Sequence, residues 1–277
     1  MIMQSVKLGY SFQHIRGPSR SHVIPSPVSD EQACEAIKAS VDALPDGVKM
    51  FLNSGEFYDN NWGIGNLKLL SRFFANHPAY AEKTFLSVKG AMSASGPDGS
   101  LEGLRRSKLD LFELAQIDLK LPVETTMKNL VTLLKEGKFS HIGLSGCNAN
   151  TLRKAHSLNI SVLAYSPLGQ GFLTGQIKSP ADADIPEGDM RAKYDRLKAI
   201  TMEKKLTPAQ LCIGWVASLG PINTSSWIIA SRTLENWNAG DVQLTQEDKK
   251  AVEEVISVNP VAGERYFGAA LQMYLWG

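Results

Sequence analysis

A tyrosine and a lysine that follow neighbouring apolar runs are the residues of this sequence best suited to chemistry. Tyr58 follows the run 48–52 after a short polar stretch, and Lys89 is the last residue of the next run, 84–89. A lysine at the end of an apolar strand is unusual, because buried lysines are rare unless they are paired. Its ammonium group is expected to lower the pKa of the Tyr58 phenol and to make it a general acid near neutral pH. Reduction of a carbonyl needs such an acid, because hydride addition leaves an alkoxide that must be protonated.

Short apolar runs alternate along the chain with amphipathic stretches, and these elements must position the two residues. Strands are predicted at 48–52, 84–89, 109–114, 141–145, 160–165 and 227–230, with 6–12 as the only candidate for an N-terminal strand. Helices are predicted between them, with starts at Ser29, Pro122, Thr207 and Thr245. This alternation indicates an α/β protein with a parallel sheet and crossover helices. The continuous apolar runs indicate strands that are buried on both faces.

Two architectures fit this order, a closed barrel and a doubly wound open sheet. The open sheet usually has a glycine-rich turn after its first strand, and the nearest candidate, Gly63-Ile64-Gly65, lacks the third glycine. A TIM-type (β/α)8 barrel of roughly 250 residues fits a chain of 277. In such a barrel the chemistry lies at the carboxyl ends of the strands. Those ends carry Asn53, Lys89, Ser145 and Tyr165.

The composition is that of an ordinary globular protein, with 43% hydrophobic residues and a formal net charge of +1. No basic run alternates with aromatic residues and no apolar run approaches the ~20 residues of a membrane span, so neither nucleic acid nor membrane is an expected partner. Three distant cysteines and the absence of a signal-peptide pattern in residues 1–12 favour the cytoplasm. The five histidines show no metal-ligand spacing, so no metal is expected. The oligomeric state is not predicted.

The segments 53–58 and 85–90 together resemble the active site of the aldo-keto reductases. The family pattern is an acidic residue, a tyrosine five residues later, and a lysine at the end of the next strand. The resemblance continues through 109–114 and 142–145 and is most specific in 165–175. The chain is most similar to the microbial pyridoxal reductase branch. The resemblance implies one aldo-keto reductase domain over 1–277, with a poorly matching segment at 1–26.

The resemblance implies a role for each matching position. Tyr58 would be the proton donor and Lys89 would lower its pKa. Asn53 stands where most of the family has an aspartate that pairs with the lysine, and Ala115 stands where many members have a catalytic histidine. The implied reaction is NADPH-dependent reduction of a small aldehyde, with pyridoxal to pyridoxine as the candidate reaction. Phe57 and Trp62 would frame this aromatic substrate.

The resemblance also implies a binding site for NADP(H). Ser145 would hydrogen-bond the nicotinamide carboxamide, and Tyr165 would stack on the nicotinamide ring. The loop around the pyrophosphate would contain Ser166, Leu168, Gly169 and Gln170. Arg232 would bind the 2′-phosphate and Asn236 the adenine. The planar fork of arginine suits a phosphate, although 232–236 could also be a helix start with a solvated face.

The chain departs from the family pattern by internal losses. Between Leu158 and Asn159 the family has a further strand and helix, and that strand carries a glutamine that holds the nicotinamide amide. The helix before Lys108 is a stub, and a Pro-Gly turn expected before Arg232 is absent. An incomplete barrel is therefore predicted, and seven strands are conceivable. Two alternatives to the enzyme remain open: a non-catalytic NADPH-binding protein, and the unstable product of a mis-spliced gene model.

Overall fold

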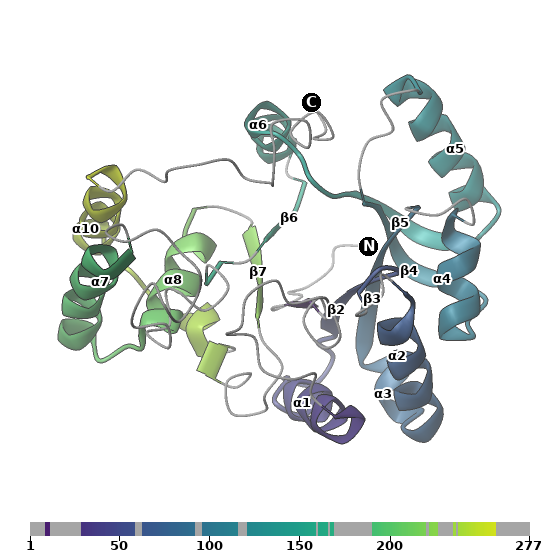
Figure 1. The fold of residues 1–277 in the computed structure, drawn as a ribbon, viewed down its shortest axis with the longest axis horizontal. Coiled ribbons are helices and arrows are strands. Elements are labelled where there is room, and N and C mark those ends of the chain that lie inside the picture. Colours follow the sequence, from purple (N-terminus) through teal and green to yellow (C-terminus); the bar gives the residue numbers. More distant parts are fainter. Residues whose placement is uncertain are drawn as a thin grey trace.

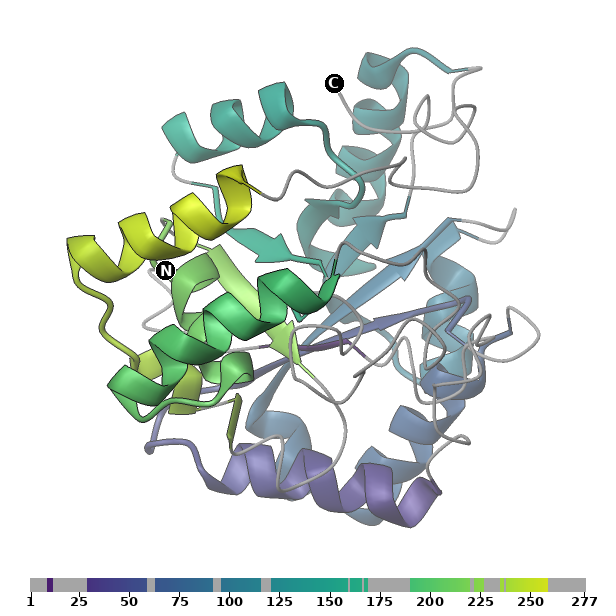
Figure 2. The same cartoon turned by 60° about the vertical axis from the view of Figure 1, so that its left-hand side comes forward.

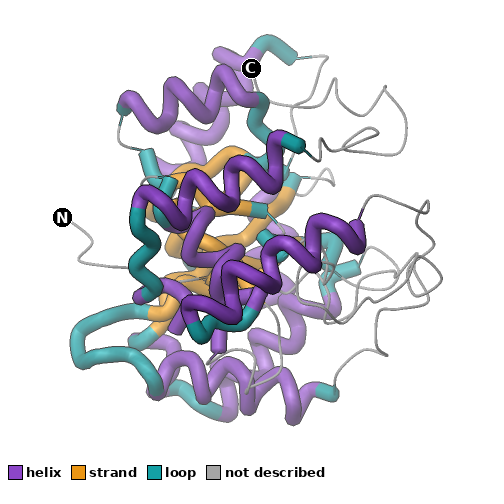
Figure 3. Tube along the Cα trace, turned by 90° about the vertical axis from the view of Figure 1, so that its left-hand side faces the viewer, coloured by secondary structure: helices purple, strands orange, loops and turns teal. Residues whose placement is uncertain are grey.

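The computed structural model describes residues 9–11, 29–58, 63–91, 96–115, 121–158, 160–165, 167–168, 190–219, 222–226, 235–236 and 238–258. In this part of the chain seven strands form a sheet in the order β5-β4-β3-β2-β1-β7-β6. Every neighbouring pair is parallel. Figure 3 shows the strands at the centre of the molecule, with helices around them. The predicted strand–helix alternation is thus confirmed.

The N-terminal strand β1, which has three residues, lies between β2 and β7 in the sheet. The strands are β1 (Gly9–Ser11), β2 (Met50–Gly55), β3 (Thr84–Gly90), β4 (Leu109–Leu114), β5 (Phe139–Leu144), β6 (Val162–Ala164) and β7 (Ile222–Ser226). Tyr10 of β1 pairs with Leu52 of β2 on one side and with Ser226 of β7 on the other. The predicted N-terminal strand within 6–12 is therefore present, and it joins the two parts of the sheet.

The helices follow the strands on the outside of the sheet (Figure 1). They are α1 (Asp30–Asp42), α2 (Gly65–Asn76), α3 (Ala79–Glu82), α4 (Gly96–Leu104), α5 (Val123–Lys135), α6 (Ala149–Ser157), α7 (Met190–Lys204), α8 (Pro208–Ala217), α10 (Gln246–Ser257) and the 3-10 helix η4 (Ala239–Asp241). The stub predicted before Lys108 is α4, which ends shortly before β4 begins.

Side-chain caps fix three of the four predicted helix starts, all but Pro122. The Ser29 hydroxyl accepts a hydrogen bond from the backbone N–H of Gln32 at 3.3 Å. Thr207 forms a full capping box, because its hydroxyl accepts from the N–H of Gln210 while Gln210 Oε1 accepts from the N–H of Thr207. Thr245 forms the same arrangement with Asp248. Each cap satisfies backbone donors that the first turn of a helix leaves unpaired.

Buried apolar side chains form two clusters, of which the larger packs helices on the sheet and the smaller packs helices on one another. The larger joins α1, α2, α4 and α5 to β2, β3 and β4, and includes Leu52, Leu70, Phe73, Leu86 and Phe112. The smaller lies among α7, α8, η4 and α10, and includes Leu197, Leu211, Ile213 and Val252. Figure 1 shows these helix groups on opposite sides of the molecule. The side of the sheet with β2–β5 is therefore the better packed of the two.

The barrel is open between β5 and β6, which are the edge strands of the described sheet. The chain passes between them through α6 alone, and none of the described residues of α6 is buried. Leu152 is 40% exposed and Leu158 is 63% exposed. Figures 1 and 2 both show α6 at the periphery, beside β6. The prediction of an incomplete barrel is confirmed, and the opening lies where the sequence was expected to lack a strand and a helix.

Several strand boundaries differ from the prediction, most clearly those of β2 and β7. The polar residues Asn53, Ser54 and Gly55 lie within β2, because they pair in register with β3 up to Lys89. The last described strand is β7 at Ile222–Ser226, whereas the apolar run 227–230 lies outside the described residues. β7 is mostly Asn, Thr and Ser, so its hydropathy gave no strand signal. In the described part, no helix is long and apolar enough to cross a membrane.

Candidate active site

The inner face of β2 and β3 carries two layers of side chains. Successive residues of a strand point to opposite faces, so Phe51 and Asn53 share one face of β2, as Phe85, Ser87 and Lys89 do on β3. The Phe51 and Phe85 rings stack with their centroids 5.5 Å apart. One pairing step nearer the carboxyl ends, Asn53 lies opposite Ser87. A polar layer thus sits on an aromatic one, which keeps water away from its lower side.

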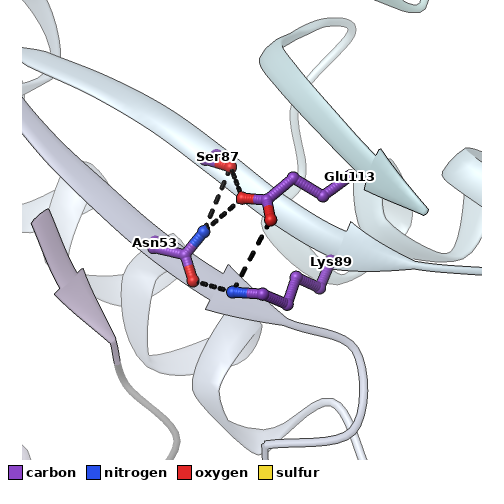
Figure 4. A network of polar contacts seen from close by, with 4 residues as sticks. All are labelled: Asn53, Ser87, Lys89 and Glu113. Carbon is purple, nitrogen blue, oxygen red and sulfur yellow. Dashed lines mark hydrogen bonds and ion pairs between the residues drawn. The ribbon is translucent and has the colours of Figure 1, made fainter. Parts of the chain in front are cut away.

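The polar layer is a closed network of Asn53, Ser87, Lys89 and Glu113 (Figure 4). Lys89 Nζ donates to Asn53 Oδ1, and Asn53 Nδ2 donates to Glu113 Oε1 and, at 3.2 Å, to Ser87 Oγ. The Ser87 hydroxyl donates to Glu113 Oε1, and Lys89 Nζ lies 3.7 Å from Glu113 Oε2. Each residue has at least two partners in the network. Such a fully satisfied network fixes side-chain positions in a buried site.

Lys89 lies in a largely buried position beside one carboxylate and one phenol. Its side chain is 12% exposed, and its Nζ lies 5.7 Å from the centroid of the Tyr58 ring. Burial lowers the pKa of Lys89, but the Glu113 carboxylate and the Tyr58 phenol outweigh this effect, so the pKa of Lys89 is raised. The ammonium form is therefore favoured at neutral pH.

Tyr58 is held by the turn that follows β2. Its backbone N–H donates to the carbonyl of Gly55 at 3.3 Å, which folds the ring back over Gly55. The ring of Phe57 packs edge-on against it, with the centroids 5.0 Å apart. Tyr58 is 3% exposed and belongs to the larger apolar cluster. The ring is thus fixed on several sides, and the position of its phenol is defined.

Glu56 anchors the same turn from the opposite direction. Its Oε1 accepts a hydrogen bond from the Ser100 hydroxyl of α4 at 2.6 Å. Burial raises the pKa of the Glu56 carboxyl, and the hydrogen bond from Ser100 lowers it by less, so the net shift is upward. Glu56 lies next to Gly90, where a Cβ would come within 2.8 Å of its Oε1. The turn that carries Tyr58 is therefore tied both to α4 and to the end of β3.

The remaining predicted residues are only partly brought to this site. Ser145 follows β5, and its backbone N–H donates to the carbonyl of Leu114 at 3.0 Å. Tyr165 follows β6, is 52% exposed, and adds to the upward pKa shift of Lys89. The Leu168 side chain is buried in the smaller apolar cluster, and Asn236 is 3% exposed. The predicted residues that lie outside the described part are Trp62, Ser166, Gly169, Gln170 and Arg232.

Two members of the network, Ser87 and Glu113, were not among the predicted site residues. Glu113 follows Phe112 near the carboxyl end of β4. Its partner Lys89 is on another strand, and the register that aligns them cannot be read from one sequence. The available signal was a glutamate at the end of an apolar strand, where an unpaired carboxylate is costly. Among the described residues, no cluster of His, Cys, Asp and Glu could hold a metal ion.

A family model decides the relationship of this chain to known proteins. The model of the aldo/keto reductase family matches residues 18–158 and 148–257. The chain belongs to the aldo/keto reductase family. The two matches meet at 148–158, which contains α6 and leads into the open edge of the barrel. The family match is thus divided at the place where the described sheet is open.

Fungal proteins are among the relatives of this aldo/keto reductase. One from Saccharomyces cerevisiae, whose name assigns it to the pyridoxal reductases, is 28% identical and covers 87% of this chain and 91% of the relative. An aldo-keto reductase of Strobilurus tenacellus is 30% identical over 76% of this chain and 79% of the relative. The first alignment spans 322 residues, which exceeds the 277 of this chain, so that relative has segments that this chain lacks.

A solved structure supports the architecture. The glycerol dehydrogenase of Gluconobacter oxydans superposes with a TM-score of 0.72, covering 95% of both chains at 19% identity. The likeness at this identity shows the fold alone. Together with the family match, it identifies the described sheet as a (β/α)8 barrel that is incomplete between β5 and β6.

Proposed function

We propose that this aldo/keto reductase catalyses the NADPH-dependent reduction of a small aldehyde, with pyridoxal as the leading candidate and pyridoxine as the product. The observation that carries the proposal is the buried Tyr58 ring beside the Lys89 ammonium at the carboxyl ends of β2 and β3. A phenol next to a fixed cation is suited to donating a proton to an oxygen that gains negative charge.

In the proposed reaction the chain itself supplies the proton and the setting for its transfer. Tyr58 donates its hydroxyl proton to the carbonyl oxygen of the aldehyde, and Lys89 stabilises the charge left on the phenol. Asn53 holds the Lys89 ammonium by accepting one of its hydrogen bonds. Reduced nicotinamide, when bound, supplies the hydride to the carbonyl carbon. Ala115 has no hydrogen-bonding side chain where many members have a histidine, so carbonyl polarisation depends on Tyr58.

The described residues fit a nicotinamide cofactor in part. Tyr165 presents a half-exposed aromatic ring at the end of β6, which suits stacking on a flat ring. Ser145 lies at the end of β5, where its hydroxyl could hold a carboxamide. Arg232 is proposed to bind the 2′-phosphate, which would favour NADPH over NADH. An aldo-keto reductase of Schizosaccharomyces pombe, 29% identical over 79% of this chain, carries NADP(+) in its name, which supports this choice.

Pyridoxal is proposed because the relative from Saccharomyces cerevisiae is named for it. Phe57 lies beside Tyr58 and is only partly buried, so its ring can contact an aromatic substrate. Trp62 is proposed to face the same substrate. The compartment proposed is the cytoplasm, since Cys34, Cys147 and Cys212 form no disulfide bond in the described structure.

The test compares wild type with Tyr58→Phe in NADPH consumption with pyridoxal. Loss of a general acid should lower kcat/KM by about 10²- to 10⁴-fold. Tyr80→Phe is the matched control, because the Tyr80 hydroxyl bonds Asp42 away from the site and its loss should leave the rate unchanged. Equal rates for wild type and Tyr58→Phe would remove Tyr58 from the mechanism. NADPH binding without turnover of any aldehyde would favour the non-catalytic binding protein.

A further inference from the structure

We infer that Glu113 supplies the counter-charge that positions Lys89, in place of the aspartate that the family pattern has at position 53. This inference rests on the proposed function, since it concerns how Lys89 supports proton donation by Tyr58. Asn53 is neutral, so it can accept a hydrogen bond from the ammonium but cannot balance its charge. A buried ammonium needs a nearby negative group, because burial without one is strongly unfavourable. Glu113 is the carboxylate that the structure places within ion-pair distance of Lys89.

The sheet register brings Glu113 to Lys89. The two residues are directly paired across β3 and β4, and the carboxylate Oε2 lies 3.7 Å from Nζ. Both side chains are mostly buried, at 12% exposed for Lys89 and 10% for Glu113. The side chains of paired residues on one face of a sheet are close enough to interact, and their positions do not depend on the loops. The counter-charge therefore comes from a rigid part of the barrel.

The strand beyond Glu113 leaves room for its side chain. Glu113 is paired on its other side with Gly143 of β5. A Cβ at position 143 would lie 2.7 Å from Glu113 Cγ, which real side chains do not tolerate. The Glu113 side chain thus occupies the space that a larger residue at 143 would fill. Gly143 and Glu113 form a matched pair.

Asn53 is the residue that fits between Lys89 and Glu113. Its amide oxygen accepts from Lys89, and its amide nitrogen donates to Glu113. An aspartate at 53 could accept from Lys89 but would place a second carboxylate against Glu113, and such pairs resist double ionisation. Asparagine at 53 and glutamate at 113 are therefore coupled: the negative charge has moved from β2 to β4, and the amide connects the two positions.

The test is a charge exchange with four proteins: wild type, Glu113→Gln, Asn53→Asp, and the double variant. Glu113→Gln should lower kcat/KM for the aldehyde by about 10- to 100-fold, part of the contribution of the general acid. In the described part of the chain, the titratable groups that act on Lys89 are Glu113, Tyr58 and Tyr165. Without the Glu113 charge the ammonium loses its proton more readily, so the alkaline limb of the pH–rate profile should move to lower pH.

Asn53→Asp alone should also lower kcat/KM, because its carboxylate and that of Glu113 oppose each other. The double variant should recover activity and the alkaline limb to near wild type, since it restores one carboxylate and one amide. Glu102→Gln on the exposed side of α4 is the control and should change neither quantity. A double variant no better than Glu113→Gln would overturn the inference.

A second measurement separates this inference from the proposed function. The free energy of unfolding of the same four proteins, measured with denaturant at neutral pH, should be lower in both single variants and recover in the double variant. This recovery is expected because the pairing stabilises the fold with or without an aldehyde. In a Lys89→Met background, Glu113→Gln should stabilise the protein, since the carboxylate then has no cation beside it. Wild type that reduces no aldehyde but shows this coupling would overturn the proposed function alone. Additive effects on unfolding would overturn the role of Glu113.

Discussion

The Tyr58 ring lies against the backbone of Gly55, so closely that a Cβ at position 55 would be 3.2 Å from both Cδ1 and Cε1 of the ring. The absence of a side chain at Gly55, the last residue of β2, thus determines how closely the Tyr58 ring approaches the strand. The backbone of Gly55 is not in the left-handed region, so an alanine there meets no backbone strain. The effect of a substitution is therefore confined to the ring.

Gly55→Ala should displace the Tyr58 ring by a few tenths of an ångström. We expect kcat/KM to fall by about 3- to 10-fold, since a full 1 Å misplacement can cost on the order of 10²-fold. The melting temperature should change little by comparison. Steady-state kinetics and thermal unfolding measure the two effects. Unchanged kinetics would show that the ring position is set by Phe57 and the turn and not by Gly55.

Gly143→Ala should disturb the network through Glu113. The new Cβ would lie 2.7 Å from Glu113 Cγ and 2.9 Å from Leu111 Cδ2, so both side chains must move. We expect a loss of about 1–3 kcal/mol in the free energy of unfolding, as for other overpacked sites. In a Glu113→Ala background, Gly143→Ala should cost less than it does in wild type, because the clash with Glu113 is absent. An equal cost of Gly143→Ala in both backgrounds on denaturant unfolding would place the strain on Leu111 instead.

Glu56→Gln should remove a pH dependence of stability. Burial raises the pKa of Glu56 above its ordinary value of 4.5, so the folded state holds this proton more tightly than the unfolded state. The stabilisation is fully present below pH 4.5 and is lost as the pH rises through the folded pKa. Glutamine stays neutral at every pH. The free energy of unfolding of the variant should therefore equal that of wild type below pH 4.5 and exceed it increasingly as the pH rises above 4.5. Unfolding curves at several pH values test this, and a constant difference between the two proteins would contradict it.

Gly137→Ala should lower stability without touching catalysis. Gly137 closes α5 at φ +80°, and its N–H donates to the Leu134 carbonyl at 3.0 Å. A side chain in the left-handed region costs roughly 1–2 kcal/mol, so the free energy of unfolding should fall by about that amount. Gly137→Asn should cost less, because asparagine tolerates this conformation better. Kinetic constants that change in either variant would show that α5 is coupled to the site.

Local sequence signals predicted the elements whose determinants are close together in the chain. Ser29, Thr207 and Thr245 were recognisable as helix starts because a cap and its partner are three residues apart. Tyr58 and Lys89 could be found because each follows an apolar run. The missing unit after α6 was also visible, as a gap in the expected order of motifs.

Features that depend on strand register could not be predicted in the same way. The contact of Lys89 with Glu113 follows from the pairing of β3 with β4, which is a property of the folded sheet. β7 was missed because its strand is held by pairing with β1 and β6 and not by its own apolar residues. The side chain of Leu168 was expected near the cofactor loop, and its burial in the smaller cluster depends on α7 and α8.

The place of β1 between β2 and β7 has a consequence for how the molecule is assembled. Its register pairs Gly9 with Ser225, so one of the first strands to be synthesised needs one of the last to complete its hydrogen bonds. Contacts between such distant parts of a sequence form slowly, because a long loop has to close first. The β2–β5 side can pack on the ribosome while one flank of β1 waits for β7. Early translation products would therefore expose the unpaired edge of β1. We expect chaperones to bind these incomplete chains more than the finished protein.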